Sequence, residues 1–187
     1  VGLVTAFPEL FDVFSQKGLV GQAIQSGKIQ IQVVNPREFT SDIHKSIDDR
    51  PYGGGDGMVM SPEPLAKSVQ RLKEQSSQSR VIYLSPQGKR LTNTIAQELS
   101  HLSGIILVCG RYGGVDERFI ATHVDEEISV GDYILNGGEV GAMCVIEAVS
   151  RFLPGVLGNK VSALSDSFSD GLLEAPQMTR PSDYEGL

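Results

Sequence analysis

The stretch "GIILVCGRYGGVDER", from Gly104 to Arg118, joins an apolar run to a glycine-rich loop with two arginines and two acids. The apolar run is typical of a buried strand, and residues 115–123 have the pattern of a helix. Glycine lets the main chain approach a ligand closely and leaves its N–H and C=O groups free to bond that ligand. This stretch therefore predicts a strand, a ligand-facing loop and a helix in direct succession.

The same alternation extends in both directions along the chain. Apolar periodicity predicts strands at 1–7, 28–34, 80–84 and 104–110, and a short strand entering a loop at 126–135. It predicts helices at 8–26, from Ser61 onward, at 91–101, 115–123 and 138–152. Gly18 and Gly21 are candidate breaks in the first of these. We expect an α/β fold with a mostly parallel sheet flanked by helices. Residues 35–58 show no period, and a long irregular stretch in a compact domain is usually functional or disordered.

Composition limits the class of protein. The chain has 187 residues, 40% of them hydrophobic, and a net charge of −7. That charge argues against a general nucleic-acid binder but leaves room for a local basic patch. There is no apolar run of membrane-spanning length and no signal-peptide pattern, so we expect a cytoplasmic protein. Cys109 and Cys144 lie in apolar runs and predict two buried, reduced thiols.

Three predicted strand ends carry glycine-rich loops: "LSPQG" (Leu84–Gly88), "CGRYGG" (Cys109–Gly114) and "SVGDYILNGG" (Ser129–Gly138). Ligands in α/β proteins lie outside the carboxyl ends of the strands, so the three loops together predict one pocket. Each loop by itself is equally consistent with a tight turn. The dinucleotide and P-loop motifs are missing, and the three histidines have no metal-ligand spacing, so we predict no metal site from the residues.

Several motifs in fixed order resemble one family: "RPYGGGDGMVM", "IYLSPQGKRL", "LVCGRYGGVDER", "DEEISVGDYILNGGE", "RFLPGVLGN" and "DSFSDGLLEAPQMTRP". They are similar to the bacterial tRNA (guanine-N1)-methyltransferases of the trefoil-knot (SPOUT) superfamily, which methylate guanine 37 beside the anticodon. The resemblance covers essentially the whole chain. It implies a deep knot in the C-terminal half of the sheet, an exception to the usual unknotted topology.

The resemblance also implies that S-adenosylmethionine binds in the knot, held mostly by main-chain groups. The cofactor-binding positions carried over are Tyr83, Leu84, Gly110, Tyr112, Ser129, Val130, Gly131, Asp132, Tyr133, Ile134, Leu135, Gly137 and Gly138. The family is a homodimer whose active site lies at the subunit interface. Residues 1–157 would form the knotted catalytic domain, and 158–187 the linker and the start of a tRNA-binding domain that is otherwise absent from this chain.

Two further residues have roles implied by the resemblance. Asp166 would be the general base that removes the N1 proton, and Arg151 would stabilise the charge that develops on O6. By themselves, Asp166 is equally well a turn residue and Arg151 a cation that favours a helix C-terminus. The substrate would be tRNA with guanine at 36 and 37, with Arg50, Lys160 and Arg180 as candidate phosphate contacts.

Gly113 departs from the family pattern, in which this position is usually glutamate and is associated with magnesium dependence. The departure keeps three interpretations open. The chain is an active methyltransferase, with or without Mg²⁺; a non-enzymatic cofactor- or RNA-binding relative impaired at Gly113; or an α/β protein whose glycines only serve turns.

Overall fold

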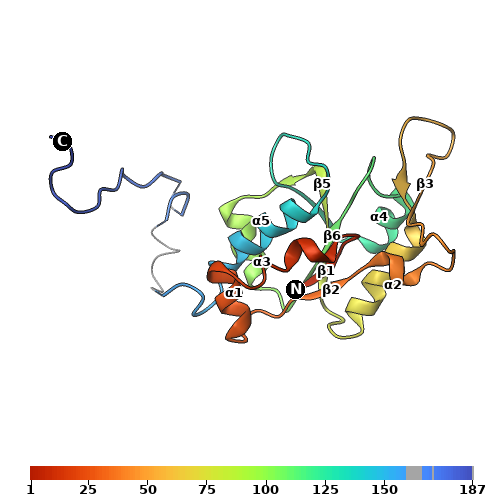
Figure 1. The fold of residues 1–187 in the computed structure, drawn as a ribbon, viewed down its shortest axis with the longest axis horizontal. Helices are drawn as coiled ribbons and strands as arrows, with labels where there is room; N and C mark the ends of the chain where they lie inside the picture. Colours follow the sequence, from red (N-terminus) through yellow and green to blue (C-terminus); the bar gives the residue numbers. More distant parts are fainter. Residues whose placement is uncertain (159–165, 170, 187) are drawn as a thin grey trace.

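A five-stranded sheet forms the centre of the molecule, and all of its strands are parallel (Figure 1). The computed structural model describes residues 1–158, 166–169 and 171–186. The strand order is β2-β1-β6-β5-β7. The strands are β1 (Gly2–Val4), β2 (Gln32–Val34), β5 (Arg80–Arg90), β6 (Ile105–Cys109) and β7 (Glu126–Ser129). The predicted mostly parallel α/β fold is confirmed.

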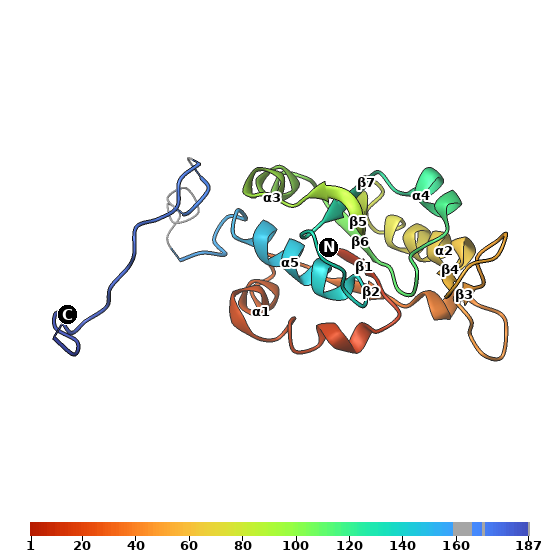
Figure 2. The ribbon, with the colours of Figure 1, turned by 90° about the horizontal axis from the view of Figure 1, so that it is seen from above.

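Helices cover both faces of this sheet (Figure 2). One face carries α1 (Gly18–Gln25), α3 (Asn93–Ser100) and α5 (Glu139–Ser150), and the other carries α2 (Pro62–Lys73) and α4 (Glu117–His123). Short 3-10 helices occur at η1 (Pro8–Phe11) and η2 (Pro36–Phe39). None of the helices in the described residues combines the length and the apolar character that a bilayer crossing requires.

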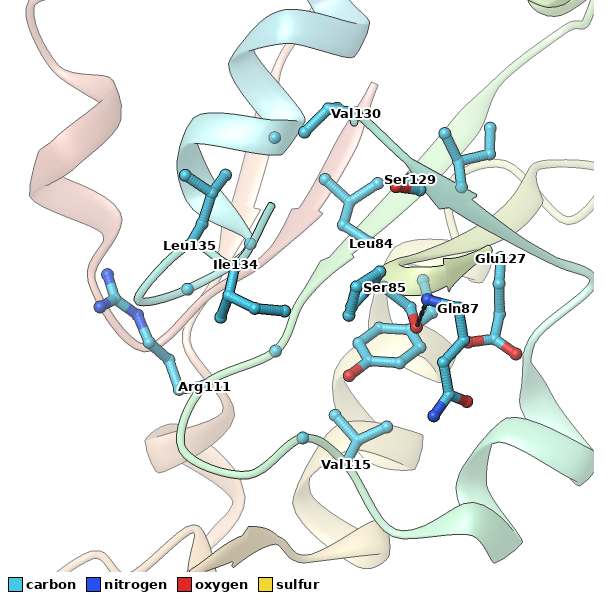
Figure 3. Close-up of a pocket in the computed structure, with 18 of the residues that line it drawn as sticks. Leu84, Ser85, Gln87, Arg111, Val115, Glu127, Ser129, Val130, Ile134 and Leu135 are labelled. Carbon is cyan, nitrogen blue, oxygen red and sulfur yellow. Dashed lines mark hydrogen bonds between the residues drawn. The ribbon is translucent and has the colours of Figure 1, made fainter. Parts of the chain in front are cut away.

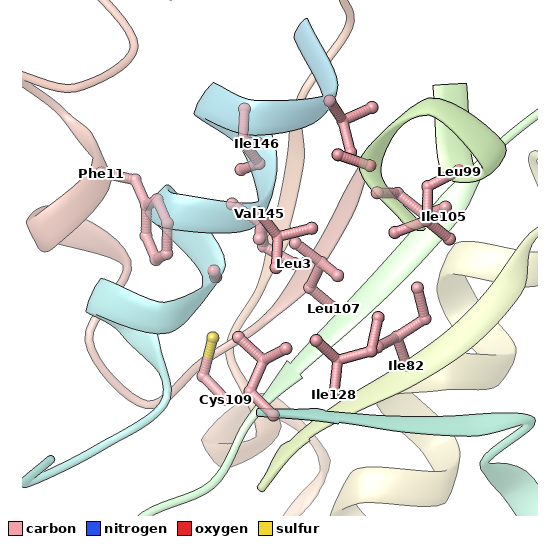
Figure 4. Close-up of a cluster of buried hydrophobic side chains, with 14 of the residues drawn as sticks. Leu3, Phe11, Ile82, Leu99, Ile105, Leu107, Cys109, Ile128, Val145 and Ile146 are labelled. Atoms are coloured by element: carbon pink, nitrogen blue, oxygen red, sulfur yellow. The ribbon is translucent and has the colours of Figure 1, made fainter. Parts of the chain in front are cut away.

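The core lies on both sides of β6, whose five residues are all buried. On one face, Leu107 packs with Leu3 and with Val145 of α5 (Figure 4). On the other face, Val108 packs with Leu65 of α2 and Phe119 of α4. An all-apolar strand buried on both faces is what a central parallel strand needs, so the sequence places β6 at the middle of the sheet.

The prediction of a helix at 8–26, with candidate breaks at Gly18 and Gly21, is wrong only as regards a continuous helix, and the break at Gly18 is confirmed. The chain forms η1, then turns, and starts α1 only at Gly18, whose φ of +68° interrupts a helical path. The prediction that both cysteines are buried is also wrong, because Cys144 is exposed whereas Cys109 is buried. Residues 142, 145, 146 and 149 form the buried stripe of α5, and position 144 falls on its opposite face.

The irregular segment 35–58 carries η2 and, with the residues after it, a small hairpin made of β3 (Asp48–Asp49) and β4 (Val59–Met60). This hairpin is tied to the loop after β6. The Gly113 N–H donates to the Met58 carbonyl at 2.9 Å, and the Met60 N–H donates to the Gly114 carbonyl at 2.9 Å. The segment without a period is therefore hydrogen-bonded to one of the three predicted ligand loops.

After β7, at the edge of the sheet, the chain returns to the end of β6. The Gly138 N–H donates to the Gly110 carbonyl at 2.9 Å, across a separation of 28 residues. This return brings two of the glycine-rich loops together. The trefoil knot itself, and the domain boundary at 157/158, stay predictions. The described residues 171–186 run away from the sheet (Figure 1).

Candidate functional site

A cavity of about 460 Å³ lies at the carboxyl ends of β5, β6 and β7, where the three glycine-rich loops meet (Figure 3). Its volume falls in the range of small-molecule sites. Twelve of the thirteen predicted cofactor positions line it: Tyr83, Leu84, Gly110, Tyr112, Ser129, Val130, Gly131, Tyr133, Ile134, Leu135, Gly137 and Gly138. The thirteenth, Asp132, instead forms an ion pair with Arg90. The loops that the sequence singled out thus enclose one site.

Close packing of the loops accounts for two of these glycines. A Cβ added to Gly138 would lie 2.7 Å from the Cys109 Cα and 3.0 Å from the Gly110 nitrogen. A Cβ on Gly110 would lie 2.8 Å from the Tyr83 ring. Because these contacts are shorter than van der Waals separation, a side chain at either position would push the loops apart.

The loop after β6 has an unusual backbone at the mouth of the cavity. Tyr112 has a φ of +59°, a left-handed conformation that costs a non-glycine residue about 1–2 kcal/mol. Its side chain is half exposed and lines the cavity. Gly113 follows, and a Cβ there would lie 3.0 Å from the Met58 carbonyl oxygen. The second glycine of the loop therefore permits the close main-chain contact with the segment before β4.

The loop after β7 presents free main-chain groups. Within the described residues, the N–H groups of Ile134, Leu135 and Gly137 donate no hydrogen bond to the protein. The apolar side chains of Ile134 and Leu135 stand beside them in Figure 3. Unpaired donors next to an apolar wall suit the edge and the face of a heterocyclic base. The residues present thus fit the adenosine part of S-adenosylmethionine.

A buried ion pair holds the two loops in place. Glu139, at the start of α5, is 1% exposed, and its Oε2 lies 2.9 Å from Nη2 of Arg111 without the angle of a hydrogen bond. Its Oε1 accepts from Arg111 Nε at 3.2 Å and from the Thr5 hydroxyl at 2.8 Å. Arg111 also donates to the Asn136 carbonyl at 3.3 Å and lies 4.5 Å above the Phe7 ring. These residues connect both loops to the end of β1.

Sequence reasoning missed this ion pair. In a sequence, an acid in the first turn of a helix is explained by the helix dipole alone, so Glu139 carries no signal of its partners. Its neighbours in space come from positions 5, 111 and 136. Only the parallel order of β1 and β6 brings these positions together.

The opposite wall of the cavity is polar, which was not predicted from the sequence either. Gln87, Glu117 and Glu127 line it. Burial raises the pKa of the Tyr83 phenol, and the negative charges of Glu127 and Glu117 raise it further. The cavity therefore has a carboxylate wall next to a phenol that stays protonated.

Arg151 and Asp166 lie together but away from the cavity. Arg151 caps the C-terminus of α5 and donates a hydrogen bond to the Asp166 carboxylate. The N-terminus of α5 borders the cavity, and the 12 residues of the helix put its other end about 18 Å away. The predicted catalytic pair is thus assembled within one chain at a distance from the predicted cofactor pocket of the same chain.

The described residues contain no group of three or more His, Cys, Asp or Glu side chains arranged to hold a metal ion. Of the candidate phosphate contacts, Arg50 and Arg180 are exposed, and Lys160 lies outside the described residues.

Comparison with known proteins gives one family. A model of tRNA (Guanine-1)-methyltransferase TrmD matches residues 1–187. Curated proteins named tRNA (guanine-N(1)-)-methyltransferase from Shewanella piezotolerans and Actinobacillus succinogenes are 53% and 50% identical to the chain over 188 residues. These alignments cover the whole chain, 76% of the first relative and 77% of the second.

A solved structure agrees with the sequence relatives. The crystal structure of tRNA (m1G37) methyltransferase from Aquifex aeolicus superposes with a TM-score of 0.83 at 40% identity. The superposition covers 99% of this chain and 77% of that one. The parallel sheet and its flanking helices are thus shared with that protein.

Proposed function

The chain belongs to the tRNA (guanine-1)-methyltransferase family, and on that premise we propose that it methylates N1 of guanine 37 in tRNA with S-adenosylmethionine as donor. The observation that carries the proposal is the cavity enclosed by the three glycine-rich loops at the ends of β5, β6 and β7. S-adenosylmethionine, when bound, supplies an electrophilic methyl group on a sulfonium. The free N–H groups of Ile134, Leu135 and Gly137 would hold its adenine, and Tyr83, Gly110 and Tyr112 would border its ribose.

Guanine N1 carries a proton and is a poor nucleophile until that proton leaves. We propose that the Asp166 carboxylate accepts this proton as general base. Arg151 would stabilise the negative charge that develops on O6. The hydrogen bond between these two side chains supports the pairing of their roles, because it keeps a carboxylate and a guanidinium side by side.

The separation of this pair from the cavity supports a homodimer in which Arg151 and Asp166 of one subunit serve the cavity of the other. An exposed apolar surface supports the same arrangement. Leu10 and Val13 near η1, and Val140 on α5, are 46%, 70% and 54% exposed. The segments η1 and α5 lie side by side in both ribbon views (Figures 1 and 2). Apolar surface of this kind in a soluble protein marks an interaction site.

The tRNA would enter on the side of the β3–β4 hairpin, because this hairpin is hydrogen-bonded to the loop after β6. Arg50, directly after β3, and Arg180 in the C-terminal segment are the described candidates for phosphate contacts. A target base in the anticodon loop must be turned out of its stack to reach the cavity. Modification of tRNA also fits a cytoplasmic location.

The test is methyl transfer to a defined tRNA. The purified protein is incubated with S-adenosylmethionine labelled in its methyl group and with tRNA bearing guanine at 36 and 37. We expect 1-methylguanosine on nucleoside analysis, and none from a control tRNA with adenine at 37. Donor binding without methyl transfer would favour the non-enzymatic relative, and the absence of both would contradict the cofactor site itself.

A further inference from the structure

The cavity has two unlike ends. Figure 3 shows Ile134 and Leu135 on one side and Gln87 and Glu127 on the opposite side. Glu117, at the start of α4, also lines the cavity. The carboxylates of the cavity are thus concentrated away from the apolar wall that suits a base. A ligand with an adenine at one end and a positive charge at the other matches this polarity.

In the part of the chain that the structure describes, Glu127 has no cationic partner for its charge. Its neighbour Glu126 pairs with Arg80 at 3.6 Å and with Lys89 at 3.9 Å, and does not line the cavity. Glu127 is partly buried, and within the described residues no cationic side chain lies within 4 Å of its carboxylate. Glu117 at least benefits from the N-terminus of α4. A partly buried carboxylate without a cation is costly in the free protein, so a bound cation would gain from it.

The field of Glu127 reaches into the cavity. Tyr83 is its register partner on β5 and is 6% exposed. Burial is the largest cause of the raised pKa of the Tyr83 phenol, and the negative charge of Glu127 is the second largest. The same phenol borders Gly110, where the two cofactor loops meet. A positive charge on a ligand that binds beside the Tyr83 phenol is therefore attracted electrostatically by the Glu127 carboxylate.

We propose that Glu127, assisted by Glu117, sets the charge selectivity of the donor site and favours the sulfonium substrate over the neutral thioether product. The proposal rests on the proposed function. In the transfer, a bond forms between guanine N1 and the methyl carbon, and the carbon–sulfur bond breaks with its electron pair staying on sulfur. The ligand thereby loses its sulfonium charge. The product keeps its α-ammonium group but presents no sulfonium charge to Glu127, which weakens the hold on the product and promotes its release.

The test measures binding rather than turnover. Calorimetric titrations compare S-adenosylmethionine with S-adenosylhomocysteine on the wild-type protein, on Glu127→Gln and on the matched control Glu126→Gln. We expect Glu127→Gln to weaken binding of S-adenosylmethionine about fivefold while binding of S-adenosylhomocysteine changes less than about twofold. Glu126→Gln should leave the ratio of the two dissociation constants unchanged. Sinefungin, which carries an amine in place of the sulfonium, should follow S-adenosylmethionine.

An unchanged ratio in Glu127→Gln, or an equal loss of both ligands, would overturn the proposal. If Glu127→Gln does not fold, Glu127→Asp replaces it, because the shorter side chain withdraws the charge from the ligand. This variant should lose part of the preference for S-adenosylmethionine over S-adenosylhomocysteine. An unchanged ratio in that variant would overturn the proposal as well. If wild-type protein binds neither ligand, the donor site itself is wrong, so the two failures are distinguishable.

Discussion

Arg111 and Glu139 form a buried ion pair that ties the loop after β6 to the start of α5, with Nη2 and Oε2 2.9 Å apart. Thr5 donates to the same carboxylate. Removing one member of a buried pair leaves the other charge without compensation. The pair therefore bears on both the stability of the fold and the shape of the donor cavity.

The first prediction concerns this pair. Glu139→Gln keeps the size of the side chain but leaves the Arg111 guanidinium unpaired, and we expect it to lower the free energy of unfolding by about 3 kcal/mol. Binding of S-adenosylmethionine should weaken as well, because Arg111 also bonds the Asn136 carbonyl. Thermal unfolding and calorimetry measure the two effects. The matched control is Glu74→Gln in the exposed pair with Arg71, which should cost about 0.3 kcal/mol. Equal stability of the two variants would show that the buried pair does not hold the loops.

The second prediction concerns the source of the catalytic residues. Asp166→Ala should abolish methyl transfer and leave donor binding nearly intact, whereas a variant with a blocked cavity should lose both. If Asp166 acts on the partner's cavity, mixing the two inactive proteins creates heterodimers with one complete site. Random mixing should restore about a quarter of wild-type activity. No recovery after subunit exchange, confirmed by native mass spectrometry, would mean that Asp166 acts within its own chain or not at all.

Gly138 provides the third prediction, and Gly138→Ala serves as the blocked variant of that experiment at donor concentrations at which its own activity is lost. A methyl group at this position would collide with the main chain at Cys109 and Gly110, which cannot rotate aside. We expect Gly138→Ala to weaken binding of S-adenosylmethionine by about 5- to 150-fold, since overpacking at a site of this kind costs about 1–3 kcal/mol. Gly158→Ala is the control, because no atom of the described residues lies within 4 Å of a Cβ there. Wild-type affinity in Gly138→Ala would show that the loops can separate without loss of the site.

The fourth prediction concerns pH. Asp116 caps α4, with its Oδ1 accepting from the Arg118 N–H at 2.9 Å. Hydrogen bonds from the Arg118 side chain hold the pKa of Asp116 below its ordinary value. Its charge therefore stabilises the fold above the unfolded-state pKa near 4, and this contribution is lost as the pH falls through the lower folded-state value.

Asp116→Asn keeps the capping oxygen and removes the charge. We expect its Tm to lie about 1–2 °C below that of wild type at pH 7, because Arg118 is exposed and water weakens the pair. The difference should vanish in acid. Asp56→Asn, at an exposed site, controls for net charge. A difference that persists unchanged into strong acid would assign it to capping geometry rather than to charge.

Much of the fold follows from local pattern. The all-apolar run of β6 and the periodicity of the later helices depend on neighbouring residues, so the sequence predicts them. The predictions that failed depended on backbone conformation or on the orientation of a helix, which a local pattern does not specify. The chain from 8 to 26 has helical spacing of apolar residues, but Gly18 at φ +68° breaks the path. Cys144 lies in an apolar run, yet only its rotation around α5 decides that it faces outward.

By itself, the sequence determined the parallel α/β architecture, the three loops of the cavity and the family resemblance, because strand burial, glycine and short motifs are local properties. Only the tertiary structure decided which residues meet across the chain. It paired Arg111 with Glu139, brought Glu127 and Tyr83 into register, and placed Arg151 and Asp166 together at the far end of α5 from the cavity. These relationships join positions between 15 and 44 residues apart. The order of the strands and the directions of the helices decide which of these residues meet. Neither property can be predicted from the residues that come into contact.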